Sequence, residues 1–156
     1  MKGFSLKVAI PQDHKMLTEL AIESKRYWNY PEEWIRGWMP ELTITPGYIQ
    51  THHVYKLTKD PGDHIIGFCA LEWEPEKLEL EIAHLWLKPA YIGKDLGRFL
   101  LDSSLNKVKA LPVKSVKVIS DPNAIGFYQK YGFLITEQVE STPPGRTLPC
   151  LVLEMT

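Results

Sequence analysis

The chain has 156 residues and a formal net charge of −1, with 44% hydrophobic and 24% charged residues. This composition is typical of a globular domain, and the length suits one domain with a substantial core but leaves no room for a second of ordinary size. The near-neutral charge balance offers no basic footprint for nucleic acid, so we do not expect a polyanionic partner.

Cysteine usage and the N-terminal segment favour a reducing compartment. Cys69 and Cys150 have no metal-type spacing and lie among apolar residues, so we expect buried, reduced thiols and no metal site. The N-terminal segment lacks the apolar core of a signal peptide, and no apolar run approaches membrane-spanning length. The sequence therefore predicts a cytoplasmic protein with no membrane partner.

The early elements follow from periodicity and from the placement of prolines. Residues 4–10 alternate as in a strand, and Pro11 suits the first position of the helix that follows. The apolar face of that helix is expected to comprise Met16, Leu17, Leu20 and Ala21. Residues 27–46 are aromatic and interrupted by prolines, so we expect one short helix between loops there.

The remaining elements alternate between strands and helices. Residues 53–58 and 64–73 flank a Pro-Gly reversal at 59–63, which predicts a β-hairpin. The later elements are expected to be a strand at 78–87, an amphipathic helix after residue 95, a strand at 113–120, a helix at 123–131 and closing strands at 133–139 and 150–155. Because this late portion requires a parallel crossover beside antiparallel hairpins, the sequence predicts an α+β fold with a mixed sheet.

A glycine-containing turn at residues 88–101 joins a strand to a helix. The free N–H groups and positive dipole end of a helix N-terminus suit a phosphate, and glycine lets the backbone approach it closely. In the alternative reading, Asp95 caps the helix and the loop binds nothing.

A second motif follows about twenty residues later. Asn123 opens it, the Phe127-Tyr128 pair comes next, and residues 130–133 read Lys-Tyr-Gly-Phe. Together the two segments resemble the signature motifs of the GCN5-related N-acetyltransferase (GNAT) superfamily, and the order of elements matches over essentially the whole chain. The first motif departs from the family pattern at Ile92, which replaces Gln or Arg, and at Asp95, which replaces glycine.

The resemblance implies a GNAT-type domain over residues 1–156, with a mostly antiparallel sheet and a splayed parallel strand pair. It implies acetyl-CoA as co-substrate and a primary amine as acceptor, joined in a ternary complex. By the resemblance, the residues that contact CoA are Leu85, Trp86, Leu87, Ile92, Gly93, Lys94, Asp95, Leu96, Gly97, Arg98, Asn123, Phe127, Tyr128 and Lys130.

Three chemical roles follow from direct attack of an amine on a thioester. Glu81 aligns with the strand glutamate that is the base in some family members, with a solvated surface glutamate as the alternative. In a regular strand Glu81 and His84 lie on opposite faces, and His84 is the rival base. Main-chain N–H groups near residues 85–87 are expected to stabilise the oxyanion. Tyr128 is the expected acid for the leaving thiolate, against a reading as a core tyrosine.

The acceptor site is expected where the early helices meet the last strands. Its candidate residues are Trp28, Tyr30, Trp34 and Arg146. Arg146 would pair either with a substrate carboxylate or with a structural acid. Asn123 would bind the pantetheine arm, or cap the helix that follows it.

Residues 24–28, the Asp121-Pro122 pair and the loop at 141–149 also resemble a bacterial subgroup of small-molecule-type acetyltransferases, a resemblance that names no substrate. The near-neutral surface favours a small amine acceptor. Homodimers are common in the superfamily, so a homodimer is a further expectation. The alternative function is a non-catalytic acyl-CoA-binding or regulatory module of the same fold.

Overall fold

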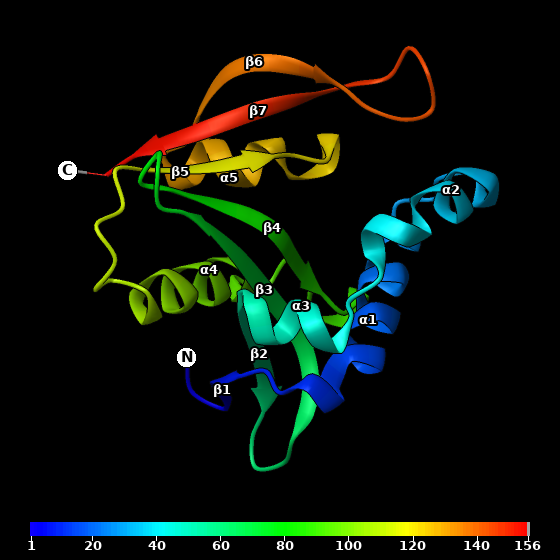
Figure 1. Cartoon of the computed structure of the whole chain (residues 1–156). Coiled ribbons are helices and arrows are strands. Elements are labelled where there is room, and N and C mark those ends of the chain that lie inside the picture. Colours follow the sequence, from blue (N-terminus) through cyan, green and yellow to red (C-terminus); the bar gives the residue numbers. More distant parts are fainter. Residues whose placement is uncertain (156) are drawn as a thin grey trace.

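A single seven-stranded sheet organises the molecule, and the computed structural model describes residues 1–155 of the chain (Figure 1). The strands are β1 Phe4–Val8, β2 His53–Lys59, β3 His64–Glu74, β4 Glu79–Leu87, β5 Ser115–Ile119, β6 Leu134–Glu140 and β7 Thr147–Glu154. The helices are α1 His14–Arg26, α2 Glu32–Leu42, α3 Pro46–Thr51, α4 Leu96–Lys107 and α5 Ile125–Tyr131. Short 3₁₀ turns at Pro11–Asp13, Pro89–Tyr91 and Pro122–Ala124 precede or join them.

The sheet is antiparallel except at one central pair. Its strand order is β1-β2-β3-β4-β5-β7-β6, and only β4 and β5 run parallel, joined through α4. This arrangement confirms the predicted α+β fold with a mixed, mostly antiparallel sheet.

Helices cover both faces of the sheet (Figure 1). Side chains of α1, α2 and α3 form one buried cluster with Phe68 and Ala70 of β3. Side chains of α4 and α5 form a second cluster with Cys69 and Leu71 of the same strand. Since successive residues of a strand point to opposite faces, β3 contributes to both cores, and the two clusters define a helix α1–α3 face and a helix α4–α5 face.

The N-terminal helices differ from the prediction in two ways. The segment expected to hold one helix holds α2 and also contributes the start of α3, where the Thr45 side chain accepts from the Tyr48 N–H at 3.0 Å and Pro46 occupies the first turn. These are ordinary helix-start signals in a segment too short to show periodicity. Met16, expected on the buried face of α1, is 48% exposed.

Strand β4 contains a bulge. Its register against β3 pairs His84 with Ala70 and Ile82 with Leu71, which leaves Ala83 as an extra residue. One extra residue reverses the face to which all later side chains of the strand point. The sequence-based expectation of a regular strand is therefore wrong.

The bulge places Glu81 on the same face as His84 and Trp86. Directly paired residues share a face, and the partners of these three residues are Glu72, Ala70 and Phe68, which lie on one side of β3. That side is the helix α1–α3 face. The prediction that Glu81 and His84 lie on opposite faces is wrong for this reason.

Strands β4 and β5 stay together over only a short distance. Their pairing covers Glu79–Glu81 of β4 and Ser115–Lys117 of β5 and then stops. Beyond it, the rest of β4 has β3 as its only strand partner within residues 1–155. The sheet therefore opens at its centre, as the resemblance implied for a splayed parallel pair.

Gly67 fixes how closely β3 and β4 approach beside this opening. A Cβ on Gly67 would lie 2.7 Å from Leu87 Cδ2 and 2.8 Å from the Trp86 carbonyl oxygen. The carbonyl belongs to the backbone and cannot move aside cheaply, so we expect Gly67→Ala to lower the free energy of unfolding in urea by about 1–3 kcal/mol.

Gly37→Ala is the matched control, because Gly37 lies within α2 and a Cβ there would meet no atom within 4 Å. That change should stabilise the protein by about 0.5–1 kcal/mol. Equal effects of the two substitutions would contradict the close approach of β4 to Gly67.

Candidate active site

A cavity of about 480 Å³ occupies the opening between β4 and β5. Residues 82–87 of β4 form one wall and residues 118–121 form the other. The remaining lining comes from the turn before α4 and its first residues (Ile92, Gly93, Asp95, Gly97, Arg98), from the α5 segment (Asn123, Ala124, Phe127, Tyr128, Lys130, Tyr131) and from Ser24 and Trp28. The cavity therefore joins the two motifs that are separate in sequence.

Unpaired backbone N–H groups lie at one end of this cavity. The N–H groups of residues 93–98 donate no hydrogen bond within residues 1–155, and the first paired one belongs to Phe99, which donates to the Asp95 carbonyl at 3.3 Å. Gly93 has φ +83° and nothing within 4 Å of a notional Cβ, so the turn is open. Successive free N–H groups at a helix N-terminus form an anion site that needs no particular side chain.

Asp95 takes a backbone conformation usually reserved for glycine. Its φ of 62° and ψ of 8° are left-handed, and its side chain makes no capping hydrogen bond. The reading of Asp95 as a side-chain cap of α4 is therefore wrong. The conformation explains why the family motif places glycine here, since a Cβ in this region is strained by roughly 1 kcal/mol.

The open edge of β4 supplies further backbone groups. The Lys88 N–H donates to the Ile66 carbonyl on the β3 side at 2.8 Å. Backbone groups alternate in direction along a strand, so those of Leu87 and Leu85 point away from β3 into the cavity, while the Trp86 N–H points to β3. Trp86 therefore faces the cavity through its side chain.

Helix α5 closes the cavity with aromatic side chains. Phe127 packs over Gly97, where a Cβ would lie 3.3 Å from the Phe127 ring. Tyr128 is only 4% exposed, and its hydroxyl makes no hydrogen bond within residues 1–155, although it is not among their fully buried unpaired atoms. The hydroxyl therefore opens to the cavity that Tyr128 lines. Burial, with a smaller effect of Cys69, raises the pKa of Tyr128, which keeps it protonated at neutral pH.

Most residues expected to contact CoA line this cavity. The exceptions are Leu96, whose side chain is 1% exposed in the core, and Lys94, whose ammonium lies 5.9 Å from the centre of the Tyr91 ring. Both still contribute unpaired N–H groups to the turn.

A buried polar cluster lies at the other end of the cavity, around Asp121. The Lys25 ammonium donates to Asp121 at 2.6 Å, and the Tyr30 hydroxyl donates to the same carboxylate at 2.9 Å. Burial alone would raise the pKa of Asp121, but these bonds lower it below its usual range, so the group is a carboxylate at neutral pH. Burial and the bond to Asp121 raise the pKa of Tyr30 to about 12.

Asn123 belongs to the same cluster. Asp121, rather than Asn123, caps the turn before α5, since its carboxylate accepts from the Asn123 N–H at 2.9 Å. The reading of Asn123 as the helix cap is wrong. The Asn123 side-chain amide donates to Asp121 at 2.9 Å and to the Tyr30 hydroxyl at 3.2 Å.

Arg146 reaches the cluster from the loop between β6 and β7. Its guanidinium carbon lies 4.8 Å from the centre of the Trp38 ring and 5.4 Å from that of Tyr30. No ion pair of Arg146 with a carboxylate occurs among residues 1–155, so the pairing with a structural acid that the sequence left open is not formed there.

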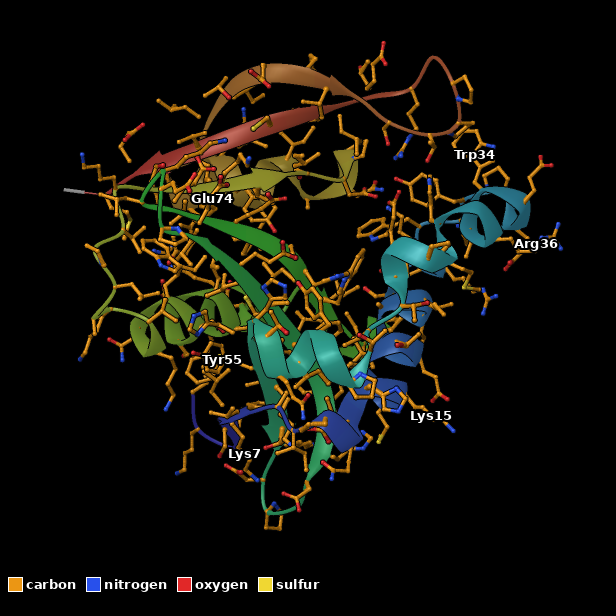
Figure 2. The ribbon with its side chains drawn as sticks, in the orientation of Figure 1. Lys7, Lys15, Trp34, Arg36, Tyr55 and Glu74 are labelled. Carbon is orange, nitrogen blue, oxygen red and sulfur yellow. The ribbon has the colours of Figure 1, made fainter. Side chains whose placement is uncertain are left out.

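The tryptophans expected at the acceptor site take different places. Trp28 lines the cavity. The Trp34 ring stacks on the Tyr30 ring, with 6.2 Å between the ring centres. Figure 2 shows Trp34 on the side of α2 that faces the β6–β7 loop, opposite Arg36. Trp34 thus supports the cluster without lining the cavity.

Glu81 lies at the closed end of the opening. It is half-buried, 3.7 Å from the Lys117 ammonium, and does not line the cavity itself. Burial raises the pKa of Glu81, and the nearby carboxylates of Glu72 and Glu79 add to this effect, which exceeds the opposing effect of Lys117.

His84 lines the cavity as a neutral ring. Burial lowers its pKa to about 4, and its Nδ1 accepts from the Trp86 indole N–H at 3.0 Å. With this pKa and with one nitrogen already used as acceptor, His84 is a poor base near neutral pH.

The described part of the chain holds neither a metal-binding cluster nor a membrane-spanning helix. Residues 1–155 contain no group of three or more His, Cys, Asp or Glu side chains arranged to hold a metal ion. Within the same range, no helix is both long and apolar enough to span a membrane.

Comparison with known proteins identifies the family. The family model for the acetyltransferase (GNAT) domain matches residues 50–134, more than half of the chain. The chain therefore belongs to the GNAT acetyltransferase family, as its two motifs suggested. A comparison with curated protein sequences gives no significant match.

Solved structures agree on the fold. The PaiA N-acetyltransferase from Thermoplasma acidophilum, solved with coenzyme A, has a TM-score of 0.78 and 22% identity over 97% of this chain and 99% of its own. A GCN5-related N-acetyltransferase from Rhodopseudomonas palustris has a TM-score of 0.77 and 18% identity over 99% of this chain and 98% of its own. A spermidine N-acetyltransferase chimera from Vibrio cholerae and hSSAT has a TM-score of 0.71 and 15% identity over 98% of this chain and 96% of its own.

Sequence reasoning missed Lys25 as the partner of Asp121. These two residues are 96 positions apart in the chain, and no periodic signal connects them. The Asp-Pro pair at residues 121–122 was a local sign of the capping turn. The Lys25 side chain, which lies 4.5 Å from the centre of the Trp38 ring, had no sequence sign.

Replacing Lys25 tests the energetic importance of the buried pair. We expect Lys25→Met to lower the free energy of unfolding in urea at pH 7 by about 3 kcal/mol, since it leaves Asp121 charged and buried. The lowered pKa of Asp121 contributes stability at neutral pH that is lost as the pH falls through that pKa. The difference in stability between variant and parent should therefore narrow as the pH falls below the usual pKa of an aspartate.

Lys7→Met is the matched control, because the Lys7–Asp63 ion pair is exposed, with side-chain exposures of 41% and 86%. Its expected cost is under ~1 kcal/mol. Similar losses for the two variants would contradict a structural role for the buried pair.

Proposed function

We propose that this protein is an N-acetyltransferase that moves an acetyl group from acetyl-CoA to a primary amine by direct attack in a ternary complex. The observation that carries the proposal is the continuity of one cavity, which runs from the unpaired N–H groups before α4 to the polar cluster around Asp121. The free Tyr128 hydroxyl opens into it. An acyl-CoA and an amine can meet within a site of this kind.

Binding of CoA rests on the backbone. The N–H groups of residues 93–98 would receive the pyrophosphate, with Arg98 at the cavity wall adding positive charge. The amide-containing pantetheine arm would lie along the open edge of β4, where the groups of Leu85 and Leu87 lack a strand partner.

The reaction requires two proton transfers. The amine nitrogen attacks the thioester carbonyl carbon, and the resulting oxyanion is stabilised by main-chain N–H donors of the opened strand. The carbon–sulfur bond then breaks, and the leaving thiolate takes the proton of Tyr128. The proton lost by the amine passes to Glu81 through water.

Glu81 is the better base of the two candidates. Its raised pKa gives a carboxylate that accepts protons more readily than an ordinary glutamate, while the lowered pKa of His84 makes that ring the weaker acceptor. Both now lie on one face, so a water chain between cavity and Glu81 does not have to cross the sheet.

Substitutions of the two proposed proton-transfer residues should separate chemistry from binding. We expect Tyr128→Phe and Glu81→Gln each to lower kcat by roughly 10²- to 10⁴-fold while acetyl-CoA binding, measured by calorimetry, stays within about threefold. The rate of the parent protein should rise as the pH increases through the raised pKa of Glu81, because the ionised carboxylate is the base. Glu81→Gln should not show this rise.

Release of CoA thiol with a panel of amines is the measurement. Parent-like rates in both variants would refute the assigned roles. Acetyl-CoA binding without turnover of any amine by the parent protein would favour a non-catalytic acyl-CoA-binding module.

Asp95 offers a test of the proposed pyrophosphate site. Asp95 lines the cavity beside the unpaired N–H groups, and a negative charge so close to them should repel phosphate. Asp95→Asn removes the charge and keeps a residue that tolerates the left-handed conformation, so we expect the Kd for CoA to fall about 3- to 10-fold at low salt.

Asp95→Gly additionally removes the strain and should bind CoA at least as tightly as Asp95→Asn. Glu76→Gln, at an exposed site in the β3–β4 turn, changes the net charge by the same +1 and controls for general changes in surface charge. Weaker CoA binding by Asp95→Asn would place the pyrophosphate elsewhere.

A further inference from the structure

Arg146 is held in place without a charge partner. Its guanidinium stacks against Trp38 and Tyr30 and donates to the Thr142 carbonyl and the Tyr30 hydroxyl, both at 3.4 Å. No carboxylate of residues 1–155 lies within ion-pairing distance of it. These contacts orient the planar group but leave its charge uncompensated and other N–H donors free.

The other charges of the cluster compensate one another. The Lys25 ammonium bonds to Asp121 at 2.6 Å and is enclosed by the rings of Tyr30, Trp38 and Trp86. The pair is nearly buried, with side-chain exposures of 11% and 15%, and its charges cancel. Among Lys25, Asp121 and Arg146, the net charge is therefore that of Arg146.

Arg146 is close to the cavity. The Tyr30 hydroxyl, to which it donates, also bonds to Asp121 and Asn123, and both of these line the cavity. Only one hydroxyl thus separates the guanidinium from the cavity wall.

The opposite end of the same face is acidic. Glu72 and Glu81 are direct cross-strand partners there, and Glu79 lies nearby on β4. Lys117 is the cation that pairs with this group within residues 1–155, through Glu79 at 3.4 Å and Glu81 at 3.7 Å. Tyr48 donates to Glu72 at 2.7 Å but carries no charge. One lysine therefore faces three carboxylates, and the group keeps a net negative charge.

We propose that the acetyl acceptor carries a carboxylate beside its amine, as an amino acid does, and that Arg146 binds this carboxylate. The inference rests on the proposed N-acetyltransferase function and names the class of its acceptor. An amino acid matches the polarity of the face, with its amine toward Glu81 and its carboxylate toward the guanidinium. A polyamine would instead bring a second cation toward Arg146, which is unfavourable.

The test compares acceptors that differ only in the carboxylate. L-Amino acids of graded side-chain size are assayed beside their decarboxylated amines, for example L-phenylalanine beside 2-phenylethylamine, together with spermidine. Release of CoA thiol is followed with the full chain and saturating acetyl-CoA. We expect kcat/KM to be at least about 10-fold higher for amino acids than for the matched amines.

Substitution of Arg146 should remove this preference selectively. Arg146→Gln is expected to lower kcat/KM for amino acids by about 10- to 100-fold, mainly through KM, and to leave that for the matched amines within about threefold. Arg146→Lys, which keeps the charge but loses the fork of donors, should recover part of the loss. Arg36→Gln is the control, since Arg36 is exposed on the outer side of α2 (Figure 2) and should keep the parent preference.

The outcomes separate this inference from the function on which it rests. If matched amines or spermidine are acetylated as well as amino acids, or Arg146→Gln keeps the parent preference, the carboxylate site is refuted and the N-acetyltransferase stands. If acetyl-CoA binds but no acceptor of any class is acetylated, both proposals fail.

Discussion

Backbone amide groups inside a folded protein need hydrogen-bond partners, and this chain leaves some of them unpaired at the centre of its sheet. Strands β4 and β5 pair only over Glu79–Glu81 and Ser115–Lys117 and then separate. The cavity depends on that separation, because Tyr128 and the start of α4 line the space that opens between the two strands. An extended ligand that carries its own amide groups can supply the missing partners, which is the physical reason a pantetheine-bearing co-substrate suits the site.

The bulge at Ala83 gives the opening two different sides. It turns Leu85 toward the helix α4–α5 face and His84 toward the helix α1–α3 face, although a regular strand would have done the reverse after Glu81. His84 and Trp86 thereby join the face on which Glu72 and Glu81 already lie, and this face also contains the Lys25–Asp121 cluster.

The sequence predicted the order of the elements because periodicity and turn residues are local signals, and the splayed strand pair followed only from the family resemblance that the two motifs carry. It did not predict the bulge, since β-bulges depend on register against a neighbouring strand and Ala83 has nothing distinctive in sequence. It also named Arg146 as a candidate for an acceptor site but gave no sign of the residues that surround it. Contacts such as Lys25 with Asp121 join segments far apart in the chain, and only the fold brings them together.

The contact between Lys25 and Asp121 has a mechanical consequence for the sheet. Lys25 belongs to α1, which packs on β3 and β4, whereas Asp121 follows β5 on the other half of the sheet. The two halves of the sheet are thus joined by the short β4–β5 pairing at one end of the opening and by a buried ion pair at the other end. The opening is therefore bridged at both ends and not at one end alone. Widening it would require breaking an ion pair that water barely reaches, so its width is set before any ligand arrives.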